Sequence, residues 1–195
     1  MKLAVDLNQA FRLLNHGPTV LVTAAYQGKV NVMAAAWNMP LDCSPARIAI
    51  VIDKKTYTRE LIEGSSTFAI NVPCRAQAGV VTQVGASSGR ELLGQNPDNK
   101  FSALDLSTFS ASKIEAPLLE GCIAWLECRL INEPHMQESY DLFIADIVAA
   151  HADSRVFSHG RWHFDGHDEL RTLHHVAGGF FFTPGESVST QSQDH

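Results

Sequence analysis

The stretch that decides the fold is VNVMAAAWNMPLDCSP, residues 30–45. It begins with the β-branched valines of a strand but then places three alanines at residues 34–36, where a core strand normally carries bulk. Small side chains let a flat ring approach the backbone closely, and Trp37 would form an aromatic wall beside that ring. The alternative is a strand that needs alanines because a bulky neighbour packs on it. Pro40 and Leu41 are expected to turn the chain away.

The composition limits the possible classes of protein. A chain of 195 residues with 45% hydrophobic content suits one core, so we expect one domain over residues 1–185 and a polar tail over 186–195. The net charge of −6 comes without a block of lysines or arginines, so neither nucleic acid nor a membrane surface is an expected partner. Without a secretory signal or a membrane-spanning run, and with four cysteines but no C-x-x-C spacing, a cytoplasmic protein is predicted.

Strands dominate the predicted secondary structure. A short helix over residues 7–14 is followed by a β-hairpin of residues 19–26 and 29–36 around the turn Gln27-Gly28. Further strands are predicted at residues 47–52, 67–72, 121–131, 140–150 and 180–182, helices at 56–63 and 77–84, a loop at 86–100 and a turn at 132–139. Strands joined mainly by hairpins predict a mainly β protein, an antiparallel barrel with a few short helices.

The strand at residues 121–131 alternates clearly. Cys122, Ala124, Leu126, Cys128 and Leu130 share one apolar face, and Glu127 and Arg129 lie on the other. Ile123, Trp125 and Ile131 make that other face partly apolar, and a barrel wall has only one interior. Either a helix of the same chain or a second subunit is expected to cover it, and the second subunit is the interpretation favoured here because only short helices are predicted.

The hexad DKKTYT, residues 53–58, lies between a predicted strand and a predicted helix. Free backbone N–H groups, the two ammonium groups of Lys54 and Lys55 and the hydroxyls of Thr56 and Thr58 would bind a phosphate there. The alternative is a solvated turn with Thr56 as an ordinary N-cap. A phosphate site near a flat-ring site describes a nucleotide-like cofactor.

The order of these motifs resembles the flavin reductase-like family of FMN-binding split barrels, and within it the flavoredoxin-like members. The matching segments are GPTVLVTA at residues 17–24, NVMAAAWNMPLDCSP at 31–45, YTRELI at 57–62, FAINVP at 68–73, SSG to NKF across 87–101, IEAPLLEGCIAWLEC at 114–128 and LHHVAGGFFFTPG at 173–185. The resemblance covers nearly the whole chain. It implies an antiparallel split β-barrel that binds FMN non-covalently, as a homodimer with the flavin near the interface.

The resemblance also implies site residues. The flavin ring would lie against Met33, Ala34, Ala35, Ala36 and Trp37, and the phosphate against Lys54, Lys55, Thr56 and Thr58. Asn71, polar within an apolar strand, is a further cofactor contact or, alternatively, a hydrogen-bond partner of a neighbouring loop. Ser87, Ser88 and Gly89 would reach the flavin of the same chain or of its partner. His174 and His175 would lie near the site, where His175 could contact flavin, and a structural role is the alternative for each.

Two other groups of residues are weaker candidates. The histidines at 159, 163 and 167 have helical spacing, but Gly160 and Gly166 weaken that helix, so no metal site is predicted. Cys43 follows the flavin stretch, but disulfide chemistry needs a second cysteine, and Cys74 is only a conjecture for it.

The expected activity is hydride transfer from NADH or NADPH to flavin, followed by transfer of the electrons to free flavin, a metal complex or a protein acceptor. No G-x-G-x-x-G motif follows a strand, so nicotinamide would bind directly over the flavin. The alternatives are a flavoredoxin-like electron carrier with protein partners and a non-catalytic FMN-binding protein.

Overall fold

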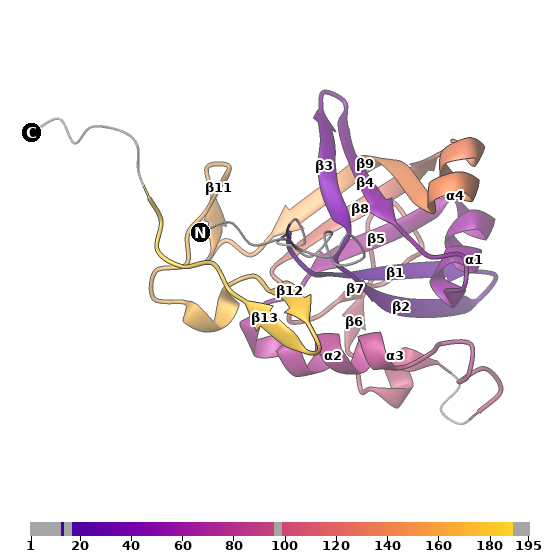
Figure 1. Ribbon diagram of the computed structural model, residues 1–195, viewed down its shortest axis with the longest axis horizontal. Coiled ribbons are helices and arrows are strands. Elements are labelled where there is room, and N and C mark those ends of the chain that lie inside the picture. The colour runs from indigo at the N-terminus through magenta and orange to yellow at the C-terminus, as the bar shows by residue number, and fades with distance from the viewer. Residues whose placement is uncertain (1–12, 14–16, 96–98, 189–195) are drawn as a thin grey trace, which may run out of the picture.

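The computed structural model describes residues 13, 17–95 and 99–188, and Figure 1 shows their arrangement. Seven strands form one antiparallel sheet in the order β2-β1-β5-β8-β9-β4-β3. Their bounds are β1 (Val20–Tyr26), β2 (Lys29–Ala35), β3 (Asn38–Cys43), β4 (Ala46–Val51), β5 (Thr67–Val72), β8 (Ala124–Ile131) and β9 (Leu142–Ala152). The two edge strands, β2 and β3, follow each other in the chain, so the barrel is split between them. The predicted antiparallel split β-barrel is confirmed.

Short elements surround the barrel. The helices are α1 (Tyr57–Ser65), η2 (Arg75–Gln77), α2 (Ala78–Ala86), α3 (Lys100–Ala103), α4 (Pro134–Tyr140) and η3 (Asp168–Leu170). Three two-stranded pairs are formed by β6 (Thr108–Phe109) with β7 (Leu118–Leu119), β10 (Phe157–Ser158) with β11 (Arg161–Trp162), and β12 (His174–Ala177) with β13 (Phe180–Phe182). In Figure 1 the β12–β13 hairpin lies over α2, and the β3–β4 hairpin projects away from the barrel.

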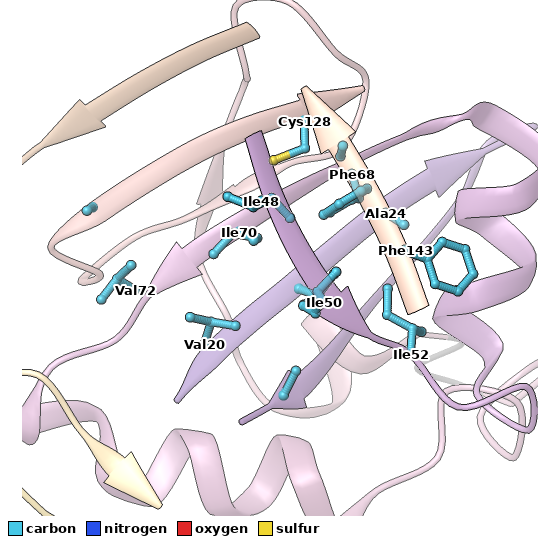
Figure 2. Packing of buried hydrophobic residues seen from close by; sticks show 14 of the residues in the cluster. Val20, Ala24, Ile48, Ile50, Ile52, Phe68, Ile70, Val72, Cys128 and Phe143 are labelled. Atoms are coloured by element: carbon cyan, nitrogen blue, oxygen red, sulfur yellow. The ribbon is translucent and has the colours of Figure 1, made fainter. Parts of the chain in front are cut away.

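The barrel interior is filled with large apolar side chains, as Figure 2 shows. Val20 and Ala24 of β1 meet Ile50 of β4, Phe68 of β5 and Phe143 of β9, and all five are almost completely buried. Because successive side chains of a strand alternate between faces, the residues between them point outward. A second cluster therefore forms outside the barrel, where Leu21 and Val32 pack against α2 and α3.

The predicted hairpin is confirmed. β1 and β2 pair from Val20↔Ala35 to Tyr26↔Lys29 around a turn in which Gln27 and Gly28 both have positive φ, 50° and 74°. Apart from residue 13, the predicted helix over residues 7–14 lies outside the described residues. So does most of the predicted polar tail.

Three predicted boundaries are wrong. Pro40 and Leu41 do not turn the chain away but belong to β3, where Pro40 is tolerated because the strand is a sheet edge with a register shift beside it. The predicted turn at residues 132–139 contains α4, which begins at Pro134 and ends in the left-handed residue Asp141. Gly64 does not end α1, whose C-cap is Ser66 in the left-handed region, with φ 57° and ψ 23°.

The outer face of β8 carries a buried carboxylate. Glu127 is 0% exposed, and its carboxylate accepts bonds from the N–H groups of Ser112 and Lys113 and from the Ser112 hydroxyl. Within β8 the predicted alternation holds, because Ala124, Leu126, Cys128 and Leu130 all pack in the barrel core, and it fails only before the strand begins. Cys122 packs in the outer cluster while Cys128 lies in the barrel core, so the two cysteines do not share a face.

The cover on that face comes from the same chain. Residues 108–119 lie over β5 and β8, where the Phe109 ring meets the Trp125 ring edge to face at 5.4 Å. Trp125 Nε1 donates to the Leu119 carbonyl over 2.8 Å. The sequence argument that Trp125 needs a second subunit therefore fails. It considered a helix of the same chain or a second subunit as cover, whereas the cover is a mostly irregular segment of the same chain.

Candidate functional site

A cavity of about 420 Å³ opens beside the end of β2. Ala34, Ala35 and Ala36 form one wall, and the last turns of α2 form the opposite wall. Helix and strand approach closely at one end of the cavity, because a Cβ placed on Gly85 would come within 3.8 Å of the Ala34 Cβ. The volume is in the range of small-molecule sites. The space left by the three alanines is thus open and not filled by a bulky neighbour.

The β12–β13 hairpin closes the third side of this cavity. Its lining residues are His175, Gly178, Gly179 and Phe181. His175 is fixed because its backbone N–H donates to Thr19 Oγ1 over 2.9 Å, and its ring meets the Phe181 ring at 5.5 Å. The structure thus places His175 at the same cavity as the alanine stretch. The double glycine, with φ 56° and 82°, makes the tight turn at the end of the hairpin.

Two predicted ring contacts do not line the cavity. The Met33 side chain packs against the barrel core, as its alternation with Ala34 requires. Trp37 is 50% exposed and lies at the corner between β2 and β3, where its carbonyl accepts from Val51 N–H. The aromatic side chain of the cavity is Phe181 instead, 144 residues further along the chain, so spacing near Trp37 could not reveal it.

The hexad forms the turn before α1. Asp53 organises it, because its carboxylate accepts from Lys55 N–H over 2.7 Å and its carbonyl accepts from the Thr56 hydroxyl over 2.8 Å. Thr56 is the N-cap of α1 by position, but its side chain makes no capping bond. Lys54 and Lys55 are exposed. An exposed, uncapped helix N-terminus with two ammonium groups nearby retains the features of an anion site.

Between this turn and β2 lies a buried cluster with unpaired polar atoms. Thr58 is completely buried and accepts a bond of 2.9 Å from Asn31 Nδ2. Asn31 Oδ1 and the Tyr57 hydroxyl are buried and have no hydrogen-bond partner. A Cβ on Gly89 would come within 2.2 Å of Asn31 Oδ1, so only glycine fits there. Buried unpaired acceptors are rare and mark places where a ligand or water supplies the partner.

The segment that contains Ser87, Ser88 and Gly89 connects the two places. It leaves the C-terminus of α2 at the cavity, where the Ser87 hydroxyl donates to the Gln83 carbonyl, and it reaches α1 at Arg90. Arg90 forms an ion pair with Glu60, and its guanidinium lies 5.7 Å from the Tyr57 ring centroid. Residues 87–89 thus run from the cavity to the first turn of α1.

Asn71 corresponds to the alternative considered for it, and not to a cofactor contact. It is 0% exposed, and its Nδ2 donates to the Leu21 carbonyl over 2.9 Å and to Thr23 Oγ1 over 3.3 Å. Its Oδ1 accepts from Leu119 N–H over 2.8 Å. The side chain therefore joins β5 to β1 and to the covering segment, and both its amide nitrogen and its oxygen already have partners.

Lys100 is a buried cation next to the cavity wall. It is 3% exposed, and its Nζ donates to the Val84 carbonyl in the last turn of α2 over 2.9 Å. Burial lowers the pKa of the Lys100 ammonium from 10.5 to about 8. A lysine in the motif NKF gave no sign of this, because burial depends on α2 and α3 packing together.

Arg90, Asn31, Tyr57 and Lys100 were not singled out from the sequence. Asn31 offered a signal, because it is a polar residue in the apolar strand β2, like Asn71 in β5. The pattern of polar residues in strands identifies both asparagines but does not separate the paired one from the unpaired one.

The cysteines and histidines form no further site among the described residues. Cys43 is exposed near the tip of the β3–β4 hairpin, whereas Cys74, Cys122 and Cys128 are buried and free. Burial raises the pKa of the Cys122 and Cys128 thiols to about 12, so they remain protonated and unreactive at neutral pH. Within residues 17–95 and 99–188, no three His, Cys, Asp or Glu side chains group closely enough to hold a metal ion.

No helix in the described part of the chain has both the length and the apolar character needed to cross a membrane.

Similar proteins place this geometry in context. The family described as Flavin reductase like domain matches residues 12–172. An uncharacterized protein of Escherichia coli K12, YddH, is 44% identical over 188 residues, which are 95% of this chain and 96% of that protein. A solved structure from Shewanella baltica, described as an FMN-binding domain of a flavin reductases-like enzyme, is 46% identical, with 97% of both chains covered and a TM-score of 0.84. Flavoredoxin of Desulfovibrio vulgaris shares the fold at 24% identity, with 91% of this chain and 92% of that chain covered and a TM-score of 0.73.

Proposed function

This chain belongs to the flavin reductase like family, and from that premise we propose that it is an FMN-binding oxidoreductase that uses NAD(P)H as electron donor. The observation that carries the proposal is the path from the alanine cavity along residues 87–90 to α1. It combines a cavity for a flat ring, two unpaired buried polar atoms and an uncapped helix N-terminus with positive charge. These are the chemical parts that a flavin mononucleotide needs, in the order in which the cofactor carries them.

Each part of the path has a role in holding the cofactor. Ala34, Ala35 and Ala36 would bring backbone groups against the ring, with His175 and Phe181 on the hairpin side. Asn31 Oδ1 would accept a hydrogen bond from a hydroxyl of the sugar-alcohol chain, and Thr58 would hold the Asn31 amide in place. The phosphate belongs at the N-terminus of α1, near Lys54, Lys55, Thr56 and Arg90.

Bound FMN would supply the redox chemistry, as a group that can accept a hydride from NAD(P)H and return electrons one or two at a time. The protein does not need a general acid or base for this, so its task is to bind, orient and exclude water. The β12–β13 hairpin and α2 would exclude water from the ring, because residues of both line the cavity.

The test is the absorption spectrum of the purified, FMN-loaded protein before and after anaerobic addition of NADH and NADPH. We expect one FMN per chain by equilibrium dialysis and bleaching of the blue absorption by one or both nicotinamides. Bound flavin that dithionite reduces but nicotinamides do not would favour an electron carrier with protein partners. Failure of both FMN and riboflavin to bind would contradict the cofactor assignment itself.

We also propose a homodimer, on different grounds from those the sequence offered. Phe180 and Phe182, on the hairpin that closes the cavity, are 74% and 57% exposed. Exposed aromatic side chains beside a ligand site suit a subunit contact that completes the site. Light scattering at micromolar concentration checks this, and Phe180→Glu should yield monomers that bind FMN more weakly. A monomeric wild type with full FMN occupancy would remove the dimer from the proposal.

A further inference from the structure

A second cavity, of about 530 Å³, lies at the mouth of the barrel. Its floor is the barrel core itself, formed by Val20, Ile48 and Ile70, whose exposed fractions are only 1%, 6% and 4%. Figure 2 shows these three side chains among the other residues of the core. A cavity of this size with an apolar floor has the dimensions of a small-molecule site.

This cavity is separate from the one beside the alanines, although the two share a wall. Thr19 and His175 line the first cavity, whereas their neighbours Val20 and His174 line the second. Alternate residues of an extended chain point to opposite sides, which places the two cavities back to back. A bond of 2.7 Å from Thr19 N–H to the Leu173 carbonyl ties the wall together.

The side walls are aromatic and aliphatic. Trp162 and Phe164 stack nearly parallel, with centroids 5.6 Å apart and an interplanar angle of 12°. Arg171 holds this side in place, because its guanidinium lies 5.9 Å from the Phe164 centroid and donates to the Pro184 carbonyl over 2.8 Å. Met39 of β3 also lines the cavity.

The polar groups are confined to one edge. Thr172 Oγ1 and His174 Nε2 lie 3.1 Å apart, and Asn38 Nδ2 donates to the Pro18 carbonyl over 2.9 Å. The lining contains no aspartate, glutamate, lysine or arginine. A charged ligand would lose its hydration without gaining a partner, and a peptide would need hydrogen-bond partners along its whole length, which one polar edge does not offer.

We propose that the barrel-mouth cavity binds a planar, uncharged, mainly apolar small molecule with a single hydrogen-bonding group, of the kind represented by a phenol. Its apolar body rests on the barrel core between Met39 and the Trp162–Phe164 pair, and its polar group meets Asn38, Thr172 and His174. The site is distinct from the flavin cavity and does not depend on the proposed function.

The experiment uses 2-naphthol as the probe and isothermal titration calorimetry as the measurement. We expect one 2-naphthol per chain, with the same affinity in the presence and absence of saturating FMN, and with quenching of tryptophan fluorescence that Trp162→Phe diminishes. Absence of binding to folded wild type, or competition between 2-naphthol and FMN, would overturn the proposal. If FMN itself does not bind, 2-naphthol binding still decides this proposal alone.

Two matched variants on β3 locate the probe. Met39 and Leu41 are 56% and 45% exposed, so a glutamate at either position leaves the fold intact, but only Met39 lines the cavity. We expect Met39→Glu to weaken 2-naphthol by about tenfold or more, because a carboxylate at the wall must be desolvated, and Leu41→Glu to leave it unchanged. Equal effects of the two variants would show that 2-naphthol does not bind against Met39, and this would overturn the proposal. A wild-type dimer that binds 2-naphthol only after Met39→Glu makes it monomeric would also overturn it, because a second copy would then occupy the cavity.

Discussion

Asn31 and Asn71 lie on the two strands that flank β1, and both are buried, but their hydrogen bonding differs. Asn71 uses its amide nitrogen and its oxygen, joining Leu21 and Thr23 to Leu119. Asn31 uses only its nitrogen, toward Thr58, and leaves Oδ1 unpaired. The paired amide belongs to the architecture, and the unpaired one belongs to the flavin site that we propose.

The difference has a physical reason. An unpaired buried acceptor costs about 1–3 kcal/mol, and a fold has no reason to keep one where only packing matters. Near Asn71 the chain supplies every partner, because residues 108–119 are laid over β5 and β8. Near Asn31 the chain supplies Gly89, which has no side chain to offer. A ligand can provide what glycine does not.

The largest effect on stability is expected for Asn71→Leu. The change leaves the Leu119 N–H buried without its acceptor, which costs about 1–3 kcal/mol, and removes the bonds to the Leu21 carbonyl and to Thr23 Oγ1, each about 0.5–1.5 kcal/mol. Urea unfolding followed by circular dichroism measures this loss. Asn31→Leu is the comparison, since it removes one bond and also one unpaired atom. A loss as large for Asn31→Leu as for Asn71→Leu would contradict the distinction between the two asparagines.

Glu127, like Asn71, is a buried polar side chain for which the chain supplies the partners, and its contribution to stability can be tested at acid pH. Burial raises the pKa of Glu127, but hydrogen bonds from Ser112 and from Lys113 N–H outweigh burial and hold the pKa below its usual value. A carboxylate with a depressed folded pKa contributes stability above its unfolded pKa, near 4.3, and that stability is lost as pH falls through the lower folded pKa. Glu127→Gln should cost about 1–3 kcal/mol at pH 7.

The measurement for Glu127 is urea unfolding at several pH values between 3 and 7. The difference in stability between wild type and Glu127→Gln should shrink as the pH falls below about 4. A difference that stays constant over this range would show that the charge of Glu127 does not matter. Ser112→Ala should reproduce part of the effect, because it removes one of the three bonds.

The sequence predicted the barrel well because its signals are local. Alternating strands, the Gln27-Gly28 turn and the order of motifs are all readable within short windows, and the fold followed from them. The alanine stretch also predicted an open space correctly, since small side chains remain small wherever the chain goes. These are properties of single elements.

What the sequence missed depends on contacts between distant segments. Phe181 and not Trp37 supplies the aromatic side of the cavity, Glu127 is covered by residues 108–119, and Lys100 is buried by α2. Asn71 and Asn31 look alike in a strand pattern, and only the partners around them differ. A single sequence does not encode such partners at any fixed spacing.

Near Asn31, variants of Lys55 and Thr56 test whether the phosphate binds at the N-terminus of α1. Replacing both with alanine should weaken FMN by about 1–3 kcal/mol for each charge-assisted hydrogen bond lost, while riboflavin, which has no phosphate, should bind as before. Equilibrium dialysis with the two ligands measures this. Equal losses for both ligands would move the phosphate away from α1.

Asn31→Leu tests the unpaired acceptor itself. The variant removes the proposed partner of a flavin hydroxyl and should weaken both FMN and riboflavin by about 0.5–1.5 kcal/mol, because both carry the sugar-alcohol chain. Asn71→Gln, which alters a buried amide away from the cavity, is the control for indirect effects on affinity. Unchanged affinity for both ligands in Asn31→Leu would remove Asn31 from the site.

The smallest effect concerns Lys100, whose amine holds the last turn of α2 at the cavity wall. The pKa of Lys100 is about 8 in the folded state and 10.5 in the unfolded state, so between these pH values the unfolded state binds more protons. The contribution of Lys100 to the free energy of unfolding therefore rises as the pH increases through that window. The gain between pH 7 and 9 is about 1 kcal/mol. Buried cysteines act in the opposite sense, since their raised pKa values make the unfolded state lose protons first.

The measurement for Lys100 is therefore the difference in stability between wild type and Lys100→Met, which share those cysteines, at pH 7, 8 and 9. Wild type should gain on the variant as pH rises. Lys113→Met, which changes an exposed side chain, is the control and should show no such trend. Lys100 bonds to α2 and not to the ligand. Lys100→Met should therefore lower FMN affinity only through a displacement of α2 at the cavity wall. A Lys100→Met difference that is flat with pH would mean that the amine titrates as it does in water, and that burial beside α2 does not govern it.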